Sequence, residues 1–146
     1  MPKLLITRRT GWNIFIELDG AVGKRGPNYA DDVLVVSLML AKIQRAVRTF
    51  GSTPVLPTRV CDGKIQKAIE EFQQYIQKRY QPPRMVCDGV VDPVGNALDY
   101  TERTLGWLHN EVMDQSKGNN TFIKEWPGSL FDMSVAGGAS KIFRKF

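Results

Sequence analysis

Each of the two cysteines in the chain stands directly before an Asp-Gly pair, in VCDGK at residues 60–64 and in VCDGVVDPVG at residues 86–95. Asp-Gly favours a tight turn, because glycine adopts positive φ without steric cost and the aspartate side chain can bond the backbone beyond it. A helix-like sequence follows each copy, AIEEFQ after the first and NALDYT after the second. The repeat therefore predicts two similar units, in each of which a turn leads into a helix.

Three stretches carry apolar residues at helical spacing. We expect the first helix to be capped by Asp31 or Asp32 and to be buried on two sides. The second begins near Lys64 and is stopped by Pro82-Pro83, and the third begins at Asn96 as its N-cap and runs to about Asp114. The stripes are Val33, Val36, Leu40, Ile43 and Val47, then Ile65, Ala68, Ile69, Phe72 and Ile76, then Leu98, Leu105, Leu108 and Val112.

The two ends of the chain have different sequence patterns from the helical middle. Residues 4–7 and 13–18 predict two strands of a hairpin that turns at Thr10-Gly11, and the glycines of residues 20–32 predict a loop. The end of the chain has no clean period but contains aromatic residues. We therefore expect a mainly α fold, with a β-hairpin arm at residues 1–20, a helical domain at 21–115, and an irregular tail at 116–146 that packs on the domain.

Length and charge limit the class of protein. A chain of 146 residues is long enough for one domain with a real core. Its net charge of +5 favours anionic partners. There is no run of eighteen apolar residues, and the apolar stretch LLI near the start is too short for a signal peptide. We expect a protein that is cytoplasmic as synthesised, or that reaches the periplasm or cell envelope by a route without a cleavable signal.

Three segments in order, VGKRGPNYADDVLVVSLML, CDGKIQKAIEEFQ and CDGVVDPVGNAL, resemble the small three-helix peptidoglycan-binding domains of bacteria over roughly residues 21–108. The matching positions are Asp32-Val33, Val36, Met39 and Leu40, then Asp62, Gly63, Ala68, Ile69, Phe72 and Gln73, then Asp88, Gly89, Pro93 and Gly95. The chain departs from the family pattern in three places. It lacks the usual Gly-x-x-Thr after the first Asp-Gly, and it has Ala97 for a Thr and Ser37 for a Gln.

The resemblance implies a three-helix bundle that binds peptidoglycan without cleaving it, as a targeting or adaptor module. Sugar rings would stack on flat side chains, while amides or carboxylates would hold the peptide stem. The candidates lie near the second turn and between the last two helices. The expected ligand-binding residues are Tyr80, Arg84, Asp88, Asn96 and Tyr100.

Two other functions stay open. The fold could serve as a protein-interaction module of a bacterial secretion or toxin system, with exposed aromatics such as Trp12, Trp126, Phe143 and Phe146 as contacts. It could also be a small cell-wall hydrolase that uses two carboxylates. Glu70 and Glu71 are candidates, although adjacent residues on a helix point apart.

The remaining side chains give weaker signals. Neither cysteine has zinc-ligand spacing and His109 is the single histidine, so we expect no metal and no cofactor. Cys61 and Cys87 could form a disulfide if the two turns lie side by side, or could be free core residues. Basic residues gather around the second helix, but Glu70 and Glu71 dilute them, which argues against nucleic acid as a partner.

Overall fold

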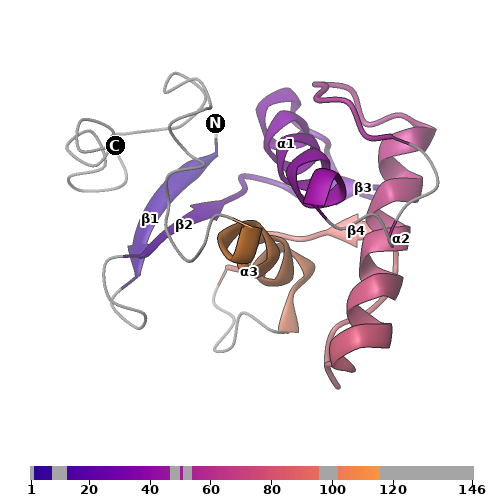
Figure 1. The fold of residues 1–146 in the computed structure, drawn as a ribbon. Helices are drawn as coiled ribbons and strands as arrows, with labels where there is room; N and C mark the ends of the chain where they lie inside the picture. The colour runs from indigo at the N-terminus through magenta and orange to yellow at the C-terminus, as the bar shows by residue number, and fades with distance from the viewer. Residues whose placement is uncertain (1, 8–12, 47–49, 51–53, 96–101, 116–146) are drawn as a thin grey trace.

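The computed structural model describes residues 2–7, 13–46, 50, 54–95 and 102–115. Three helices and two small antiparallel sheets of two strands each follow one another along these residues (Figure 1). The fold is therefore mainly α, as expected. The elements are β1 (Lys3–Thr7), β2 (Asn13–Glu17), β3 (Val22–Gly23), α1 (Ala30–Ala46), α2 (Gly63–Tyr80), β4 (Val90–Val91) and α3 (Thr104–Gln115).

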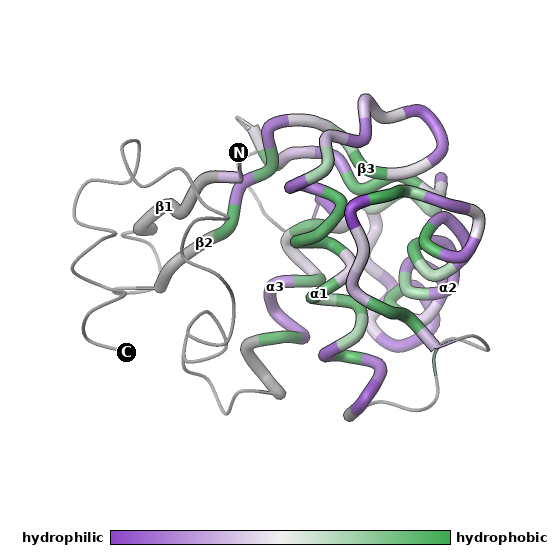
Figure 2. The backbone as a smooth tube through the Cα atoms, turned by 90° about the horizontal axis from the view of Figure 1, so that it is seen from above, coloured by the Kyte–Doolittle hydropathy of each residue, from purple (hydrophilic) through white to green (hydrophobic). Residues whose placement is uncertain are grey.

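The predicted N-terminal hairpin is confirmed. β1 and β2 pair antiparallel, with Lys3 opposite Glu17 and Thr7 opposite Asn13. The predicted turn at Thr10-Gly11 lies outside the described residues. Figures 1 and 2 place the hairpin on one side of α1 and α3, while α2 lies on the other side.

Helix α2 matches its prediction at both ends. Asp62 is the N-cap, and its Oδ1 accepts a hydrogen bond from the Ile65 amide at 3.0 Å. The helix ends at Tyr80, after which Gln81 takes the left-handed conformation, with φ of 52°, directly before the two prolines. Figure 2 shows hydrophobic and hydrophilic residues alternating along its turns. The predicted apolar stripe is buried, and Gln73 is buried with it.

Helix α1 is buried on two sides as expected, but the predicted capping is wrong. Val35 and Met39 are fully buried beyond one edge of the predicted stripe, and Ser37 and Ala41 are buried beyond the other. Asp32 lies inside the helix, and its carboxylate accepts from the Gly20 amide at 2.9 Å and the Asp19 amide at 3.2 Å. The preceding loop thus folds back and presents its own free amides to this carboxylate. Asp31 instead forms an exposed ion pair with Arg59.

Helix α3 begins later than the sequence suggests. It starts at Thr104, and Glu102 and Arg103 precede it outside the α-helix, so a helix running from Asn96 is wrong for these residues. Gly95 adopts φ of 58° and donates its amide to Glu17, so the chain turns where a helix start was expected. Asn96 and Leu98 themselves lie outside the described residues.

The two Asp-Gly segments are not similar units, which corrects the central sequence expectation. Gly63 is the first residue of α2, where Asp62 acts as the cap. Gly89 instead has φ of 74° and leads into strand β4, because Asp88 Oδ1 accepts from the Val90 amide at 3.0 Å and closes a local turn. The same four letters thus start a helix once and a strand once.

Both segments nevertheless lie beside β3. β3 pairs with β4 through Val22 opposite Val91 and Gly23 opposite Val90. A Cβ on Gly23 would collide with the carbonyl oxygen of Gly89, so only glycine allows this approach. The Gly23 backbone also forms a hydrogen bond with Cys61, which opposes the burial that raises the pKa of this thiol.

The two cysteines do not form the disulfide that the sequence left open. Both are free thiols, with Cys61 half-buried and Cys87 exposed. Burial raises the pKa of the Cys87 thiol, and the neighbouring Asp88 charge adds to this rise. Both segments thus contact Gly23 of β3, and their cysteines stay unpaired.

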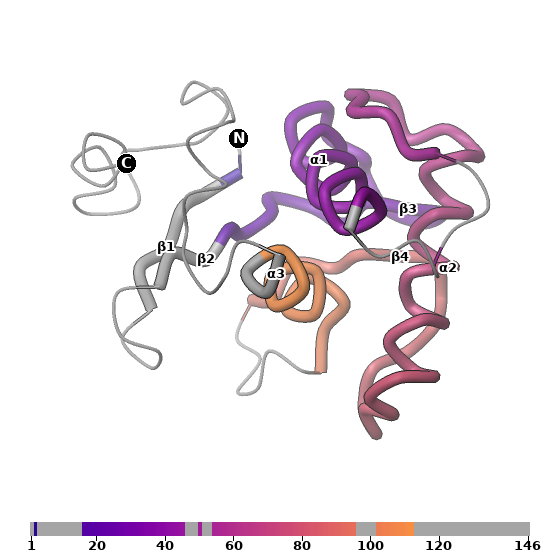
Figure 3. Tube along the Cα trace, viewed as in Figure 1, coloured from indigo at the N-terminus to yellow at the C-terminus, as the bar shows by residue number. Residues whose placement is uncertain are grey.

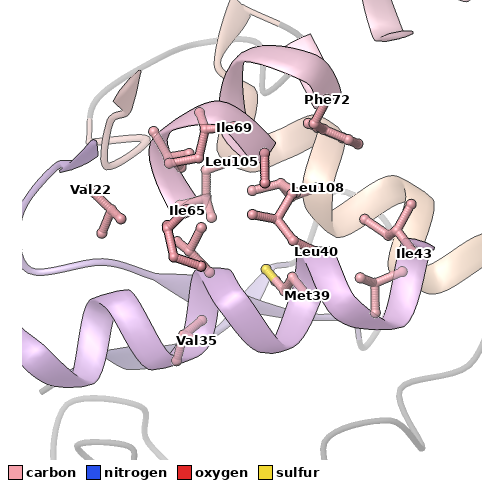
Figure 4. Close-up of a cluster of buried hydrophobic side chains, with 14 of the residues drawn as sticks. Val22, Val35, Met39, Leu40, Ile43, Ile65, Ile69, Phe72, Leu105 and Leu108 are labelled. Carbon is pink, nitrogen blue, oxygen red and sulfur yellow. The ribbon is translucent and has the colours of Figure 1, made fainter. Parts of the chain in front are cut away.

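The small β3–β4 sheet lies where the three helices meet. β3 contacts α1 and α2, and β4 contacts α2 and α3 (Figures 1 and 3). Side chains from all these elements form one core, part of which is shown in Figure 4. Its largest fully buried members are Ile16, Met39, Leu40, Ile43, Ile69, Phe72, Ile76 and Leu105.

The hairpin is bound to this core. Ile16 is fully buried in the same hydrophobic cluster as the helices, and so is most of Leu18. Glu17 between them accepts from three amides, those of Leu18 at 3.0 Å and of Val94 and Gly95 at 2.9 Å each. Residues 16–18 therefore belong to the helical body rather than to a separate arm. No helix among the described residues has the length and apolar character needed to cross a membrane.

Candidate functional site

The predicted ligand-binding residues divide into three groups. Tyr80 and Arg84 both lie against α3 or the residues that lead into it. Asp88 lies at the turn before β4, among partners of its own. Asn96 and Tyr100 lie outside the described residues.

Tyr80 and Trp107 form a stacked pair that we call the aromatic shelf. Their ring centroids are 4.8 Å apart and their planes differ by 27°. Tyr80 comes from the last position of α2 and Trp107 from the first turns of α3. Trp107 is half-buried against the core, whereas Tyr80 remains 40% exposed. Part of the Tyr80 side chain thus stays open to solvent where the end of α2 contacts the first turn of α3.

Glu111 fixes the orientation of Tyr80. The phenol of Tyr80 donates a hydrogen bond of 2.9 Å to Glu111 Oε1, and Glu111 is almost fully buried. Partial burial raises the pKa of Tyr80, and the hydrogen bond and charge of Glu111 raise it further. Trp107 and Glu111 are four residues apart on α3, so they lie on one face of the helix and contact the ring and the hydroxyl of the same tyrosine.

Two guanidinium groups border the shelf. Arg79 places its Cζ 5.4 Å from the centre of the Tyr80 ring, in a cation–π arrangement, and donates to the Tyr75 hydroxyl at 3.2 Å. Arg84 donates to Glu102 at 2.8 Å, just before α3. Both arginine side chains are largely exposed. Their partners hold them in place while the charges remain open to solvent.

Hydrogen bonds from Gln77 hold the chain after α2 against the end of that helix, and this places Arg84 beside Glu102. Gln77 Nε2 donates to the carbonyl of Pro82 at 3.1 Å and to that of Met85 at 2.8 Å. Because the two prolines cannot continue the helix, these bonds make residues 81–85 return alongside its last turn. The local sequence QPPRM thereby sets the edge of the site.

The Asp88 side chain stabilises the turn before β4. Its Oδ1 accepts from the Val90 amide and, at 3.3 Å, from Gln73 Nε2. Gln73 also donates to the Val90 carbonyl at 3.0 Å and to the Thr104 hydroxyl at 2.9 Å, and its Oε1 accepts from the Gly89 amide at 2.8 Å. The amide group has only two hydrogens for three acceptors, so the longest of these bonds, to Asp88, is the weakest.

The glutamates proposed as hydrolase candidates are engaged elsewhere. Glu70 forms an ion pair with Lys24, and Glu71 forms one with Lys67 at 3.8 Å. Within the described residues, no group of three or more histidine, cysteine, aspartate or glutamate side chains is arranged to hold a metal ion.

Sequence reasoning identified Tyr80 but missed Trp107, Glu111 and Arg79 as members of the site. The signal available was the four-residue spacing of Trp107 and Glu111 on one predicted helix face. The spacing does not show that Tyr80 would meet them, because this depends on how α2 and α3 cross. Comparisons with family models, with curated proteins and with solved structures find no significant match to this chain.

Proposed function

We propose that this protein binds bacterial peptidoglycan without cleaving it, and that the aromatic shelf receives the sugar rings. The observation that carries the proposal is the exposed Tyr80 ring, stacked on Trp107 and oriented by Glu111. The apolar face of a sugar ring packs well on flat aromatic side chains. The order of the sequence segments that resemble peptidoglycan-binding domains supports the same reading.

The shelf is suited to binding because it is already ordered. Two neighbours hold the Tyr80 ring, so little side-chain freedom would be lost when a ligand packs against it. Arg79 and Arg84 offer charged donors beside the shelf. Guanidinium groups bind carboxylates with two parallel hydrogen bonds, and peptide stems carry such carboxylates. The exposed Arg84–Glu102 pair contributes little to stability, so Arg84 can exchange partners.

The contacts of the carboxylates near the shelf support binding without catalysis. Glycoside hydrolysis needs an acid and a second carboxylate on either side of the scissile bond. Glu111 is buried behind the Tyr80 hydroxyl, and Glu102 is paired with Arg84. Both act here as acceptors that position the residues of the shelf.

The experiment is a pelleting assay with purified insoluble peptidoglycan. Wild-type protein is expected in the pellet, and Tyr80→Ala is expected to weaken binding about tenfold because it removes the outer ring of the shelf. Tyr29→Ala is the matched control, since Tyr29 is also an exposed tyrosine but precedes α1. The Tyr29 ring lies beside Gly20, whereas Tyr80 is the last residue of α2.

Two results would contradict the proposal. Wild-type protein that stays in the supernatant would rule out wall binding, and equal loss in both tyrosine variants would rule out the shelf as its site. Release of soluble muropeptides from the pellet would favour the cell-wall hydrolase instead.

A further inference from the structure

Residues 54–60 lie between α1 and α2 outside any helix or strand, with bends at Arg59 and Val60, and their burial has a period of three. Val55 is buried and Thr58 and Cys61 are half-buried, while the two residues between each of these positions are exposed. A polyproline II helix has three residues per turn, so a segment of this kind buries one of its three faces and exposes the other two. We call residues 54–60 the proline ridge. Its exposed residues are Pro54, Leu56, Pro57, Arg59 and Val60.

Helix α1 holds the proline ridge in place through its side chains. Gln44 Oε1 accepts from the Val55 amide at 2.7 Å. Ser37 Oγ, which is fully buried, accepts from the Thr58 amide at 3.0 Å and lies 3.2 Å from the Thr58 carbonyl oxygen. The backbone is therefore fixed at both inward-facing positions before any partner arrives, which lowers the entropic cost of binding.

The exposed side chains have no role in the core. Leu56 is 74% exposed and Val60 is 68% exposed, the highest values among the large hydrophobic side chains of the described residues. They lie next to two exposed prolines and an exposed arginine. Among the described residues, Arg59 forms an ion pair with Asp31 at 3.6 Å, in which Arg59 is exposed and Asp31 is half-buried. A surface pair of this kind contributes little and can be exchanged for another carboxylate.

Pro54-Val-Leu-Pro57-Thr-Arg59 has the spacing of a proline-rich recognition motif followed by a cation. Such segments dock into aromatic-lined grooves as preformed polyproline II helices. With three residues per turn, two faces enter the groove and the third points away. Here the third face carries Val55 and Thr58, and α1 already covers it. The two faces that a groove would need are the two that are open.

We propose that the proline ridge is a docking motif for a partner protein whose groove has aromatic walls and an acidic pocket. The walls receive Pro54, Leu56 and Pro57, and the acidic pocket receives Arg59. Charge complementarity selects this kind of partner, because Arg59 is the charged side chain of the ridge and the whole chain carries +5. The motif is separate from the aromatic shelf, since it precedes α2 and the shelf follows it.

The test uses the full chain and a purified SH3 domain as probe, because its groove combines aromatic walls with an acidic pocket. Isothermal titration is expected to show saturable binding for the wild type. Leu56→Asp and Arg59→Gln are each expected to weaken it about tenfold. Val86→Asp is the matched control, since Val86 is 65% exposed but lies after α2. Circular dichroism checks that all variants keep their helices.

Three results would overturn the proposal. Absence of wild-type binding would exclude an accessible motif, and unchanged affinity of Leu56→Asp or equal weakening by Val86→Asp would exclude this ridge as its site. A concentration-dependent dimer that Leu56→Asp dissolves would show that a second copy of the chain is the occupant. Peptidoglycan pelleting of Leu56→Asp should equal that of the wild type, which keeps this test separate from that of the shelf.

Discussion

At the scale of single residues, folding changes the ionisation of the Asp32 carboxyl group. It is fully buried, and burial raises its pKa above the ordinary value of 3.8. The hydrogen bonds from the Asp19 and Gly20 amides favour the charged form and oppose this rise only in part. The side chain thus joins the loop to α1 at the cost of a desolvated charge.

Asp32→Asn should change how stability depends on pH. Because the folded pKa lies above the unfolded one, the folded state binds more protons between the two values, and stability falls as pH rises through that window. The wild type should therefore gain stability relative to Asp32→Asn as pH is lowered from neutral to below about 4. Urea unfolding across this range measures the difference. Parallel pH profiles for the two proteins would show that Asp32 is not perturbed.

Gln73→Leu should be strongly destabilising. The leucine fills a similar space but leaves the Gly89 amide, the Val90 carbonyl and the Thr104 hydroxyl without their partner. Unsatisfied buried groups cost about 1–3 kcal/mol each, so we expect a loss of at least about 2 kcal/mol in the free energy of unfolding. Gln74→Leu, at the exposed neighbouring position, is the control and should change it little. If Gln73→Leu lowers the free energy of unfolding no more than Gln74→Leu does, water must satisfy the groups that the Gln73 side chain binds.

For single residues, the sequence shows which side chains have suitable chemistry, but it does not show what each of them contacts in the fold. Tyr80 was predicted as a ligand residue for its chemistry, and its exposed ring keeps that prediction open. Asp88 was predicted for the same site, but its carboxylate closes a turn and meets Gln73. The difference depends on long-range packing, because Gln73 reaches Asp88 from the middle of α2.

At the scale of elements, the helices follow from periodicity and the short strands do not. The stripe of α2 is visible in the sequence because its five apolar residues recur at helical spacing, and all five are buried. β3 and β4 have two residues each, too few to show a period, and Val22 of β3 pairs with Val91 of β4, far away in the sequence. The start of α3 was misjudged because Gly95 is turned by a bond to Glu17, a residue far away in sequence.

The two Asp-Gly segments should respond in opposite ways to the same substitution. Gly63→Ala places a methyl in open space at the first position of a helix, so it should raise the free energy of unfolding by about 0.5 kcal/mol. Gly89→Ala forces an alanine to φ of 74° and crowds Glu70, so it should lower it by about 1 kcal/mol or more. Chemical denaturation of both variants compares them. Equal effects would mean that the two turns have the same conformation after all.

At the scale of the whole molecule, the hairpin and the helical body are held as one unit by Glu17. Its carboxylate accepts from the Val94 and Gly95 amides, and Ile16 beside it enters the core. The glycines after residue 19 favour a boundary near residue 20, because composition alone does not show that Ile16 and Leu18 pack against the helices.

Glu17→Ala should lower the free energy of unfolding by about 1–3 kcal/mol, since it removes the acceptors of three amides. Glu17→Gln keeps one acceptor oxygen and should fall between the wild type and the alanine variant. Thermal unfolding followed by circular dichroism measures both. An unchanged midpoint for Glu17→Ala would indicate that water satisfies these amides as well as the carboxylate does.

The pairing of β3 with β4 joins the region before α1 to the region after α2, and α1 also packs on α3. A backbone cut at the exposed Arg59 would therefore leave two pieces that are still joined by the packing of α1 on α3 and by the pairing of β3 with β4. We expect such nicked protein to migrate as one species on size-exclusion chromatography and to separate only in denaturant. Two polypeptides encoded apart, one ending near residue 59 and one starting there, should then reassemble when they are expressed together.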